Sequence, residues 1–187
     1  MKAQDLRPGQ AITHEGDLWL VTGCEHVKPG KGPAYAQLKL KNLNTGTNLE
    51  KRFRSVEEVE QAFLDRREME FLYADTSEAV FMDKENYEQM SVPLDQLEGK
   101  IEYLTPNIEV ICLMHAGNLV EVELPSSVDL EVTDTAPQPK GSTQTNQLKE
   151  ATLSTGLDTR VPPFIEMGEV VRISTETGEY LGRADGS

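Results

Sequence analysis

Cysteine and histidine, which often take part in catalysis or bind metals, are scarce in this chain. Of its 187 residues two are cysteine and three are histidine, and His14, His26 and His115 show no paired ligand spacing. Cys24 and Cys112 lie far apart without a CxxC pair, which favours buried, reduced thiols over a disulfide or metal site. The chain also lacks a P-loop, a GxSxG elbow and an HExxH motif. Catalysis is therefore the least supported class, and no metal or cofactor is expected.

Long apolar runs and aromatic residues are scarce as well. No apolar stretch near Met1 is long enough for a signal peptide or a membrane span, so a cytoplasmic protein with no membrane partner is expected. Aromatic residues make up 6% of the chain and do not cluster on a basic strand. This argues against a binder of single-stranded nucleic acid that depends on base stacking.

Basic residues are outnumbered, but their distribution is uneven. The net charge of −14 would normally argue against binding a polyanion. Residues 1–63, however, hold nine Lys and Arg against eight Asp and Glu, whereas residues 64–187 hold nine against twenty-four. Residues 28–54 contain one acid, Glu50, and seven basic residues: Lys28, Lys31, Lys39, Lys41, Lys51, Arg52 and Arg54. This segment is either a solvated face, the usual role of a charge run, or a basic binding patch.

The surroundings of Lys31 favour the binding patch. Lys31 is the centre of the run Pro29-Gly30-Lys31-Gly32-Pro33. Because proline fixes φ and glycine admits the positive φ values of tight reversals, the run predicts a short, stiff turn that presents one side chain. A lysine presented in this way is a candidate functional residue.

The flanks of this turn predict a hairpin with a basic outer face. Strands are expected over residues 18–22 and 34–41, and the second alternates, with polar Gln37, Lys39 and Lys41 opposite an apolar face. A turn at residues 44–46 leads into a third strand over residues 49–54.

The rest of the chain predicts short strands with little helix, which is typical of small barrels. A helical turn or two is expected over residues 56–63, and a short amphipathic helix over residues 94–104 with Leu94, Leu97, Ile101 and Leu104 on one face. The polar run 134–150 predicts an exposed loop. The further strands are expected over residues 69–74, 78–82, 108–114, 119–124, 128–133, 151–153, 160–165, 169–173 and 179–183.

With these residues laid out, the chain resembles the bacterial elongation factor P family over essentially its whole length. Residues 26–32, with 39–43 and 45–46, resemble the hairpin of the family's first domain. Residues 151–156, with Val161-Pro162, Gly168-Glu169 and 177–180, resemble its third-domain signature. The resemblance implies an all-β chain with an SH3-like (KOW-type) N-terminal barrel and two OB-fold barrels, in an elongated, tRNA-like shape. The domains expected are residues 1–64, 65–126 and 127–187.

The resemblance also implies a function without enzymatic activity. The family binds the ribosome between the peptidyl and exit sites and stimulates peptide-bond formation at consecutive prolines. Lys31 would position the acceptor end of the peptidyl-tRNA, and the chain would act as a monomer in contact with rRNA. The RNA-contact candidates on the hairpin are Lys39, Lys41, Lys51, Arg52 and Arg54. Gly141 and Thr143 match the family's segment that faces the exit-site codon, although loop residues without a contact are an equal alternative. Tyr180 and Arg183 match the family's C-terminal end near the small subunit, although a tyrosine in a barrel strand is often a core residue.

Two positions depart from the family pattern. Many relatives carry a group added to the matching lysine by a modifying enzyme, but Pro33 makes the tip palindromic, as in a subgroup whose lysine acts unmodified. An unmodified Lys31 is therefore the hypothesis. Ser142 stands where the family usually has an acid, which puts the exit-site codon contact of that loop in doubt.

Three other interpretations stay open at this point. SH3-like and OB barrels also occur in generic RNA-binding or DNA-binding proteins of transcription or RNA handling, since fold does not determine function. A paralogue resembling elongation factor P is another, although its tip usually departs from Pro-Gly-Lys-Gly. An enzyme that uses Lys31 for a Schiff base is the third, and an exposed tip offers it no burial.

Overall fold

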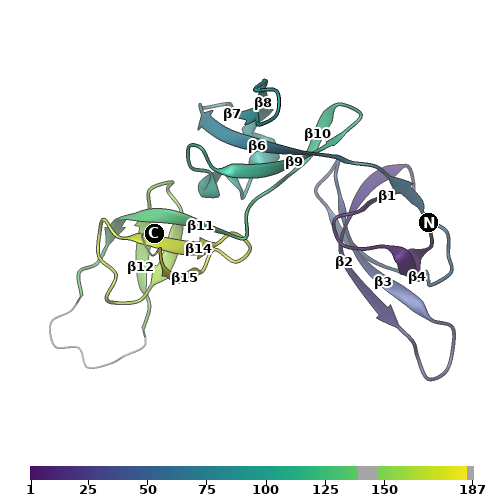
Figure 1. Ribbon diagram of the computed structural model, residues 1–187. Helices are drawn as coiled ribbons and strands as arrows, with labels where there is room; N and C mark the ends of the chain where they lie inside the picture. Colours follow the sequence, from purple (N-terminus) through teal and green to yellow (C-terminus); the bar gives the residue numbers. More distant parts are fainter. Residues whose placement is uncertain (139–146, 185–187) are drawn as a thin grey trace. The chain divides into compact units, whose positions relative to one another are not determined.

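The computed structural model of the protein describes residues 1–138 and 147–184 (Figure 1). All regular structure in this part of the chain is β-strand or short 3₁₀ helix, which confirms the all-β prediction. The strands form three five-stranded sheets. The chain divides into two compact units, Met1–Arg67 with Cys112–Glu121, and Glu68–Ile111 with Val122–Ser187.

The first sheet has the strand order β4-β3-β2-β1-β5. Its strands are β1 (Ala11–His14), β2 (Asp17–Val27), β3 (Tyr35–Asn42), β4 (Asn48–Arg54) and β5 (Glu60–Ala62), preceded by the 3₁₀ helix η1 (Ala3–Asp5).

Alternation along β3 separates the core of the first sheet from its outer face. Ala36, Leu38 and Leu40 are fully or almost fully buried and pack with residues of β1, β2, β4 and η1. Lys39 is exposed between them. Successive side chains of a strand point to opposite faces, so the predicted apolar and basic faces are both present.

The second sheet has the order β10-β9-β6-β7-β8. Its strands are β6 (Asp65–Ala74), β7 (Glu78–Asp83), β8 (Gln89–Pro93), β9 (Glu109–His115) and β10 (Asn118–Glu123), with η2 (Leu94–Leu97) and η3 (Ile101–Tyr103) between β8 and β9. Strands β6 and β7 are joined by a turn at residues 75–77. There the Asp75 carboxylate accepts hydrogen bonds from the amides of Ser77 and Glu78, which lowers the pKa of Asp75.

The third sheet has the order β13-β12-β11-β14-β15. Its strands are β11 (Ser127–Thr135), β12 (Lys149–Leu153), β13 (Asp158–Val161), β14 (Val170–Ser174) and β15 (Tyr180–Arg183). The core of this sheet includes Tyr103, which comes from η3 and packs with buried aliphatic residues such as Leu130 and Ile173. Tyr103 also lies against the turn at Gly178, where an added Cβ would come within 3.1 Å of the tyrosine hydroxyl.

Two helix predictions are wrong. Residues 56–63 form a turn followed by β5, because this segment pairs with β1, with Ala62 opposite Ala11. Residues 94–104 form two 3₁₀ helices instead of one amphipathic helix, because the chain reverses at Gly99, whose φ is +75°. That left-handed conformation, which glycine adopts readily, cannot continue a right-handed helix.

Several smaller expectations also change. The strand expected over residues 160–165 ends at Val161, because Pro162 and Pro163 cannot donate ladder hydrogen bonds. Strands β1 and β8 were not predicted. Cys112 is buried as expected, but Cys24 is only half-buried, and burial raises the pKa of its thiol.

We predict that Leu38→Ala unfolds the first sheet more easily, by about 2–5 kcal/mol, because it leaves a cavity at a fully buried position. Trp19 is the single tryptophan and packs against this core, so its fluorescence in a denaturant titration reports on the first sheet. The exposed neighbour Lys39→Ala serves as control, with an expected change within about 0.5 kcal/mol. Equal shifts for both variants would contradict the assignment of this core.

Candidate nucleic-acid interface

A seven-residue loop, residues 28–34, joins two long paired strands. We call this loop the arm and its run Pro29–Pro33 the tip. Val27, the last residue of β2, pairs with Tyr35, the first residue of β3. The hairpin can be followed in Figure 1 as the segment joining β2 to β3. Every residue from Lys28 to Pro33 is exposed. The paired strands therefore hold the two ends of a loop that is itself open to solvent.

Only one of the two glycines at the tip needs to be glycine for its backbone conformation. Gly32 has φ of +106°, in the region that other residues rarely adopt, whereas Gly30 has no positive φ. An added Cβ at Gly30 would meet nothing within 4 Å. The predicted tight reversal thus depends on Gly32, with fixed prolines on both sides.

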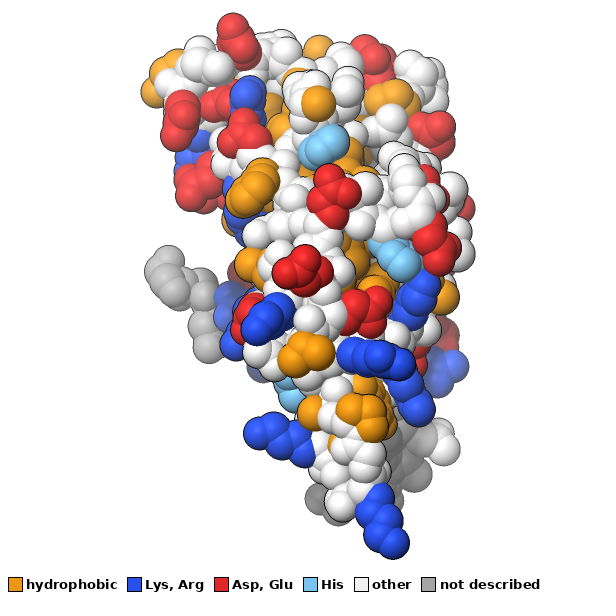
Figure 2. Space-filling view, turned by 90° about the vertical axis from the view of Figure 1, so that its right-hand side faces the viewer, with side chains coloured by type: hydrophobic (Ala, Val, Ile, Leu, Met, Phe, Trp, Pro, Cys, Tyr) orange, Lys and Arg blue, Asp and Glu red, His pale blue; other side chains and the backbone are white. Residues whose placement is uncertain are grey.

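Lys31 projects from this loop with its ammonium group available. Within residues 1–138 and 147–184, neither Lys31 nor Lys28 has an ion pair or a side-chain hydrogen bond. Figure 2 shows Lys and Arg side chains gathered toward the lower end of the face in view. An unpaired ammonium group on a fixed backbone is suited to binding phosphate or another electron-rich group as a point charge.

Lys39 lies on the outer face of the sheet, where its stem crosses β2. The opposite residue of β2 is Gly23, and an added Cβ there would lie 3.3 Å from Cδ of Lys39. The Lys39 ammonium is 3.6 Å from the Glu50 carboxylate, which also accepts a hydrogen bond of 3.2 Å from Gln37. Both charged side chains are well exposed, so this pair is weak and the lysine can exchange partners.

Arg52 and Arg54 follow on the same face of β4. Arg54 pairs in register with Tyr35, and Arg52 pairs with Gln37. The Arg52 guanidinium lies over the ring of Tyr35, 5.0 Å from its centroid. The Arg54 side chain has no partner in the described part of the chain. Tyr35 is a residue of this site that the sequence pattern does not indicate.

Two RNA-contact candidates of the hairpin, Lys41 and Lys51, differ from the others in exposure or in the face of the sheet on which they lie. Lys41 forms an ion pair with Glu121 and is less exposed than Lys39. Lys51 pairs in register with the buried Leu38 and therefore lies on the opposite face from Lys39. The structure does not bring Lys51 together with the other candidates of this hairpin.

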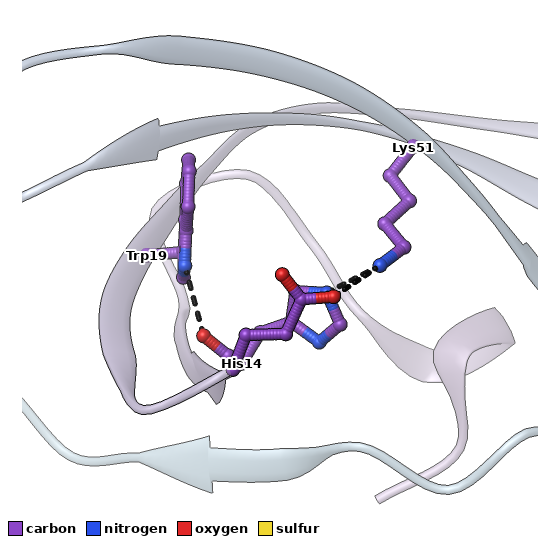
Figure 3. Close-up of polar contacts among 4 residues, drawn as sticks. His14, Trp19 and Lys51 are labelled. Atoms are coloured by element: carbon purple, nitrogen blue, oxygen red, sulfur yellow. Dashed lines mark hydrogen bonds and ion pairs between the residues drawn. The ribbon is translucent and has the colours of Figure 1, made fainter.

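Lys51 is instead part of a polar cluster at the turn between β1 and β2 (Figure 3). Its ammonium donates to Nε2 of His14 at 2.6 Å and to the Glu15 carboxylate at 3.1 Å. Because a lysine ammonium can only donate, this nitrogen of His14 acts as the acceptor. The hydrogen bond and the charge of Lys51 lower the pKa of Glu15.

The remaining candidates lie on the third sheet or outside the described residues. Tyr180 is half-buried and packs against the third core. The Arg183 guanidinium is 3.1 Å from the Glu169 carboxylate and lies over the ring of Phe164, 4.9 Å from its centroid. Gly141 and Thr143 lie outside the residues that the structure describes.

Comparison with known proteins gives a consistent assignment. The family model of the elongation factor P KOW-like domain matches residues 2–59, the OB-domain model residues 64–122, and the C-terminal model residues 128–183. Elongation factor P of Moorella thermoacetica is 46% identical over 184 residues, which are 98% of this chain and 100% of that protein. The chain belongs to the elongation factor P family. It is therefore a translation elongation factor.

Two further members of the elongation factor P family agree with this assignment. The protein of Acidithiobacillus ferrooxidans is 44% identical over 98% of this chain and 99% of its own length. That of Nitrosospira multiformis is 44% identical over 97% of both chains. The predicted SH3-like (KOW-type) and OB folds are confirmed.

A solved structure of lower similarity is titled eukaryotic translation initiation factor 5A from Methanococcus jannaschii. It is 24% identical, with a TM-score of 0.48, over 66% of this chain and 93% of that one. Within the described residues, no helix is long and apolar enough to cross a membrane.

We predict that Lys51→Met raises the pKa of Glu15, because the variant removes the hydrogen bond and charge that lower it. A folded-state pKa below the unfolded value adds stability above the unfolded pKa, and this stability is lost as pH falls through the folded pKa. Hence part of the stability difference between wild type and Lys51→Met should disappear in acid. The side-chain carboxyl of Glu15 can be followed by NMR.

The matched control for this titration is Lys39→Met, which removes the same charge from the opposite face of the sheet. It should leave the pKa of Glu15 where it is in the wild type. An identical Glu15 titration curve in Lys51→Met and wild type would contradict the role given to this ion pair.

Proposed function

We propose that this elongation factor binds the ribosome between the peptidyl and exit sites and stimulates peptide-bond formation at consecutive prolines. In this proposal Lys31 positions the acceptor end of the peptidyl-tRNA. The observation that carries it is the exposed, unpaired ammonium of Lys31 on a loop whose two ends are paired in register. Membership of the elongation factor P family supports it independently.

The proposed mechanism needs no chemistry from the factor. Proline is a poor nucleophile in peptide-bond formation on the ribosome. A peptidyl-prolyl ester can also adopt geometries that keep the reacting atoms apart. A factor that orders the tRNA end removes part of that entropic barrier, and the ribosome performs the reaction. Lys31 acts by position and charge, and not as an acid, base or nucleophile.

We further propose that Lys31 acts unmodified. The prolines at positions 29 and 33 restrict the loop, and Gly32 adopts the φ of +106° that the reversal between them needs. The two prolines support a lysine whose own length is sufficient. A stiff loop loses less conformational entropy on binding than a flexible one. A lysine-modifying enzyme is then not required as a partner.

The proposal assigns the other candidates to binding. Lys28, Lys39 and Arg54 lie in the loop or on the outer face of the hairpin and would contact tRNA or rRNA phosphates. Arg52 shares the outer face, with its guanidinium over the ring of Tyr35. Lys41, Lys51, Gly141, Thr143, Tyr180 and Arg183 stay candidates without a shared surface in the described structure. A cytoplasmic monomer of three domains, with boundaries near residues 64 and 126, completes the proposal.

We predict that Lys31→Ala abolishes the relief of a stall at three consecutive proline codons in a reconstituted translation system. The loss in rate should be at least about tenfold, about 1.4 kcal/mol in the barrier, since the positioned charge is gone. The measurement is the rate of full-length product formation with recombinant, unmodified protein. A message without consecutive prolines should be translated equally with either protein.

Lys28→Ala is the matched control, because it removes the same charge from the same loop. It should weaken binding and so require more factor, but it should keep most of the maximal rate. If the unmodified wild type gives no relief, the mass of the native peptide that contains Lys31 decides between a missing modification and a wrong function. A variant Lys31→Ala as active as wild type would overturn the proposal.

A further inference from the structure

We propose that the stacking of Arg52 on Tyr35 orients the arm, so that these two residues position Lys31. The orienting contact is a property of the hairpin alone. Its consequence for peptide-bond formation rests on the function proposed above. Neither residue needs to touch the substrate, and both would act through the backbone that carries the tip.

Tyr35 occupies the base of the arm. It is the first residue of β3, with Val27 as its partner in β2 and Arg54 as its partner in β4. The amide of Ser55 donates to the carbonyl of Ala34 at 3.1 Å, which is the last bond between this end of β4 and the loop. The arm therefore leaves the sheet at the Val27–Tyr35 pair, and a tilt of the arm as a whole would turn about this pair.

Arg52 reaches Tyr35 diagonally across the gap between two strands. In register Arg52 lies opposite Gln37, one pair further into the same face of the sheet. Diagonal neighbours of this kind are within reach of long and aromatic side chains. The distance of 5.0 Å from guanidinium to ring centroid is within the range of a cation–π contact. The contact thus ties the first residue beyond the loop to the middle of the edge strand β4.

The two faces of the arm base are held by different contacts. On the inner face Ala36 and Phe53 are paired and buried in the core. On the outer face Tyr35 is half-buried, and Arg52 covers its ring. Contacts on both faces resist bending in both directions, whereas removal of the outer one would leave the arm free to tilt toward the core side.

The alternative role for Arg52 is a direct phosphate contact, in which only its charge matters. Arg54 separates the two roles, because it is the same residue type, on the same face of the same strand, without the ring beneath it. Replacement of either arginine by glutamine removes one positive charge. Only Arg52→Gln also removes the stack on Tyr35.

The first experiment measures the free protein and needs no ribosome. We expect ¹⁵N relaxation to give lower order parameters for the amides of Gly30, Lys31 and Gly32 in Tyr35→Ala and in Arg52→Gln. Tyr35→Phe, which keeps the aromatic face, and Arg54→Gln should match wild type. Trp19 fluorescence confirms that each variant is folded. Unchanged tip order in Tyr35→Ala and Arg52→Gln, or a wild-type tip already without order, would overturn the orienting role.

The second experiment measures stall relief against factor concentration for the same variants. A positioning role predicts a several-fold lower maximal rate for Tyr35→Ala and Arg52→Gln, at a similar half-saturating concentration, and rescue by Tyr35→Phe. Arg54→Gln should instead raise the half-saturating concentration. If Arg52→Gln behaves as Arg54→Gln does, Arg52 contributes only charge and the inference is wrong.

The two experiments fail in different ways. If Tyr35→Ala and Arg52→Gln have lower order parameters at the tip but the wild type relieves no stall, the proposed function is wrong and the orienting contact stands. If the wild type relieves the stall but Tyr35→Ala changes neither the tip order nor the maximal rate, the proposed function stands and the orienting role is wrong.

Discussion

The antiparallel pairing of β2 with β3 is the interaction on which the rest of the first sheet depends. Its register runs from Trp19 opposite Asn42 to Val27 opposite Tyr35, with one irregularity between Val21 and Gly23. Side chains alternate along a strand, so a slip of one residue would turn Leu38 outward and Lys39 into the core. The same pairing therefore buries the core, exposes the basic face and fixes both ends of the loop that carries Lys31.

A strongly acidic chain can present a basic surface because charge acts locally. The net charge of −14 belongs to the whole chain, but interactions between exposed charges are largely screened beyond about 8–10 Å at physiological ionic strength. Within the hairpin the partners decide which cations are available. Lys41 and Lys51 are paired with carboxylates, Lys39 only weakly so, and Lys31 remains unpaired in the described structure.

The sequence predicted most strands and the exposed tip, because strand alternation and the Pro-Gly-Lys-Gly-Pro run are local signals. It also contains a signal for Lys51, which lies two residues from both Leu49 and Phe53 and so shares their face of the strand. Arg52 lies on the opposite face. The break at Gly99 and the burial of Tyr103 in the third core could not be predicted in this way. Spacing alone does not distinguish one helix from two short 3₁₀ turns, and the partners of Tyr103 are distant in the chain. The stack of Arg52 on Tyr35 likewise needs the register between two strands.

Rigidity links the fold of this arm to its proposed role. A lysine on a mobile loop would lose conformational entropy each time it was ordered against a tRNA, and that loss would weaken the effect on the reaction. Here the Val27–Tyr35 pair fixes the loop ends, and Arg52 covers the outer face of the arm base. The two prolines of the tip each fix a φ angle. The loop then loses its conformational entropy when the first sheet folds. The burial of Leu38 and its neighbours offsets this loss. A core substitution far from Lys31 can for this reason reduce activity without altering a single contact of the tip.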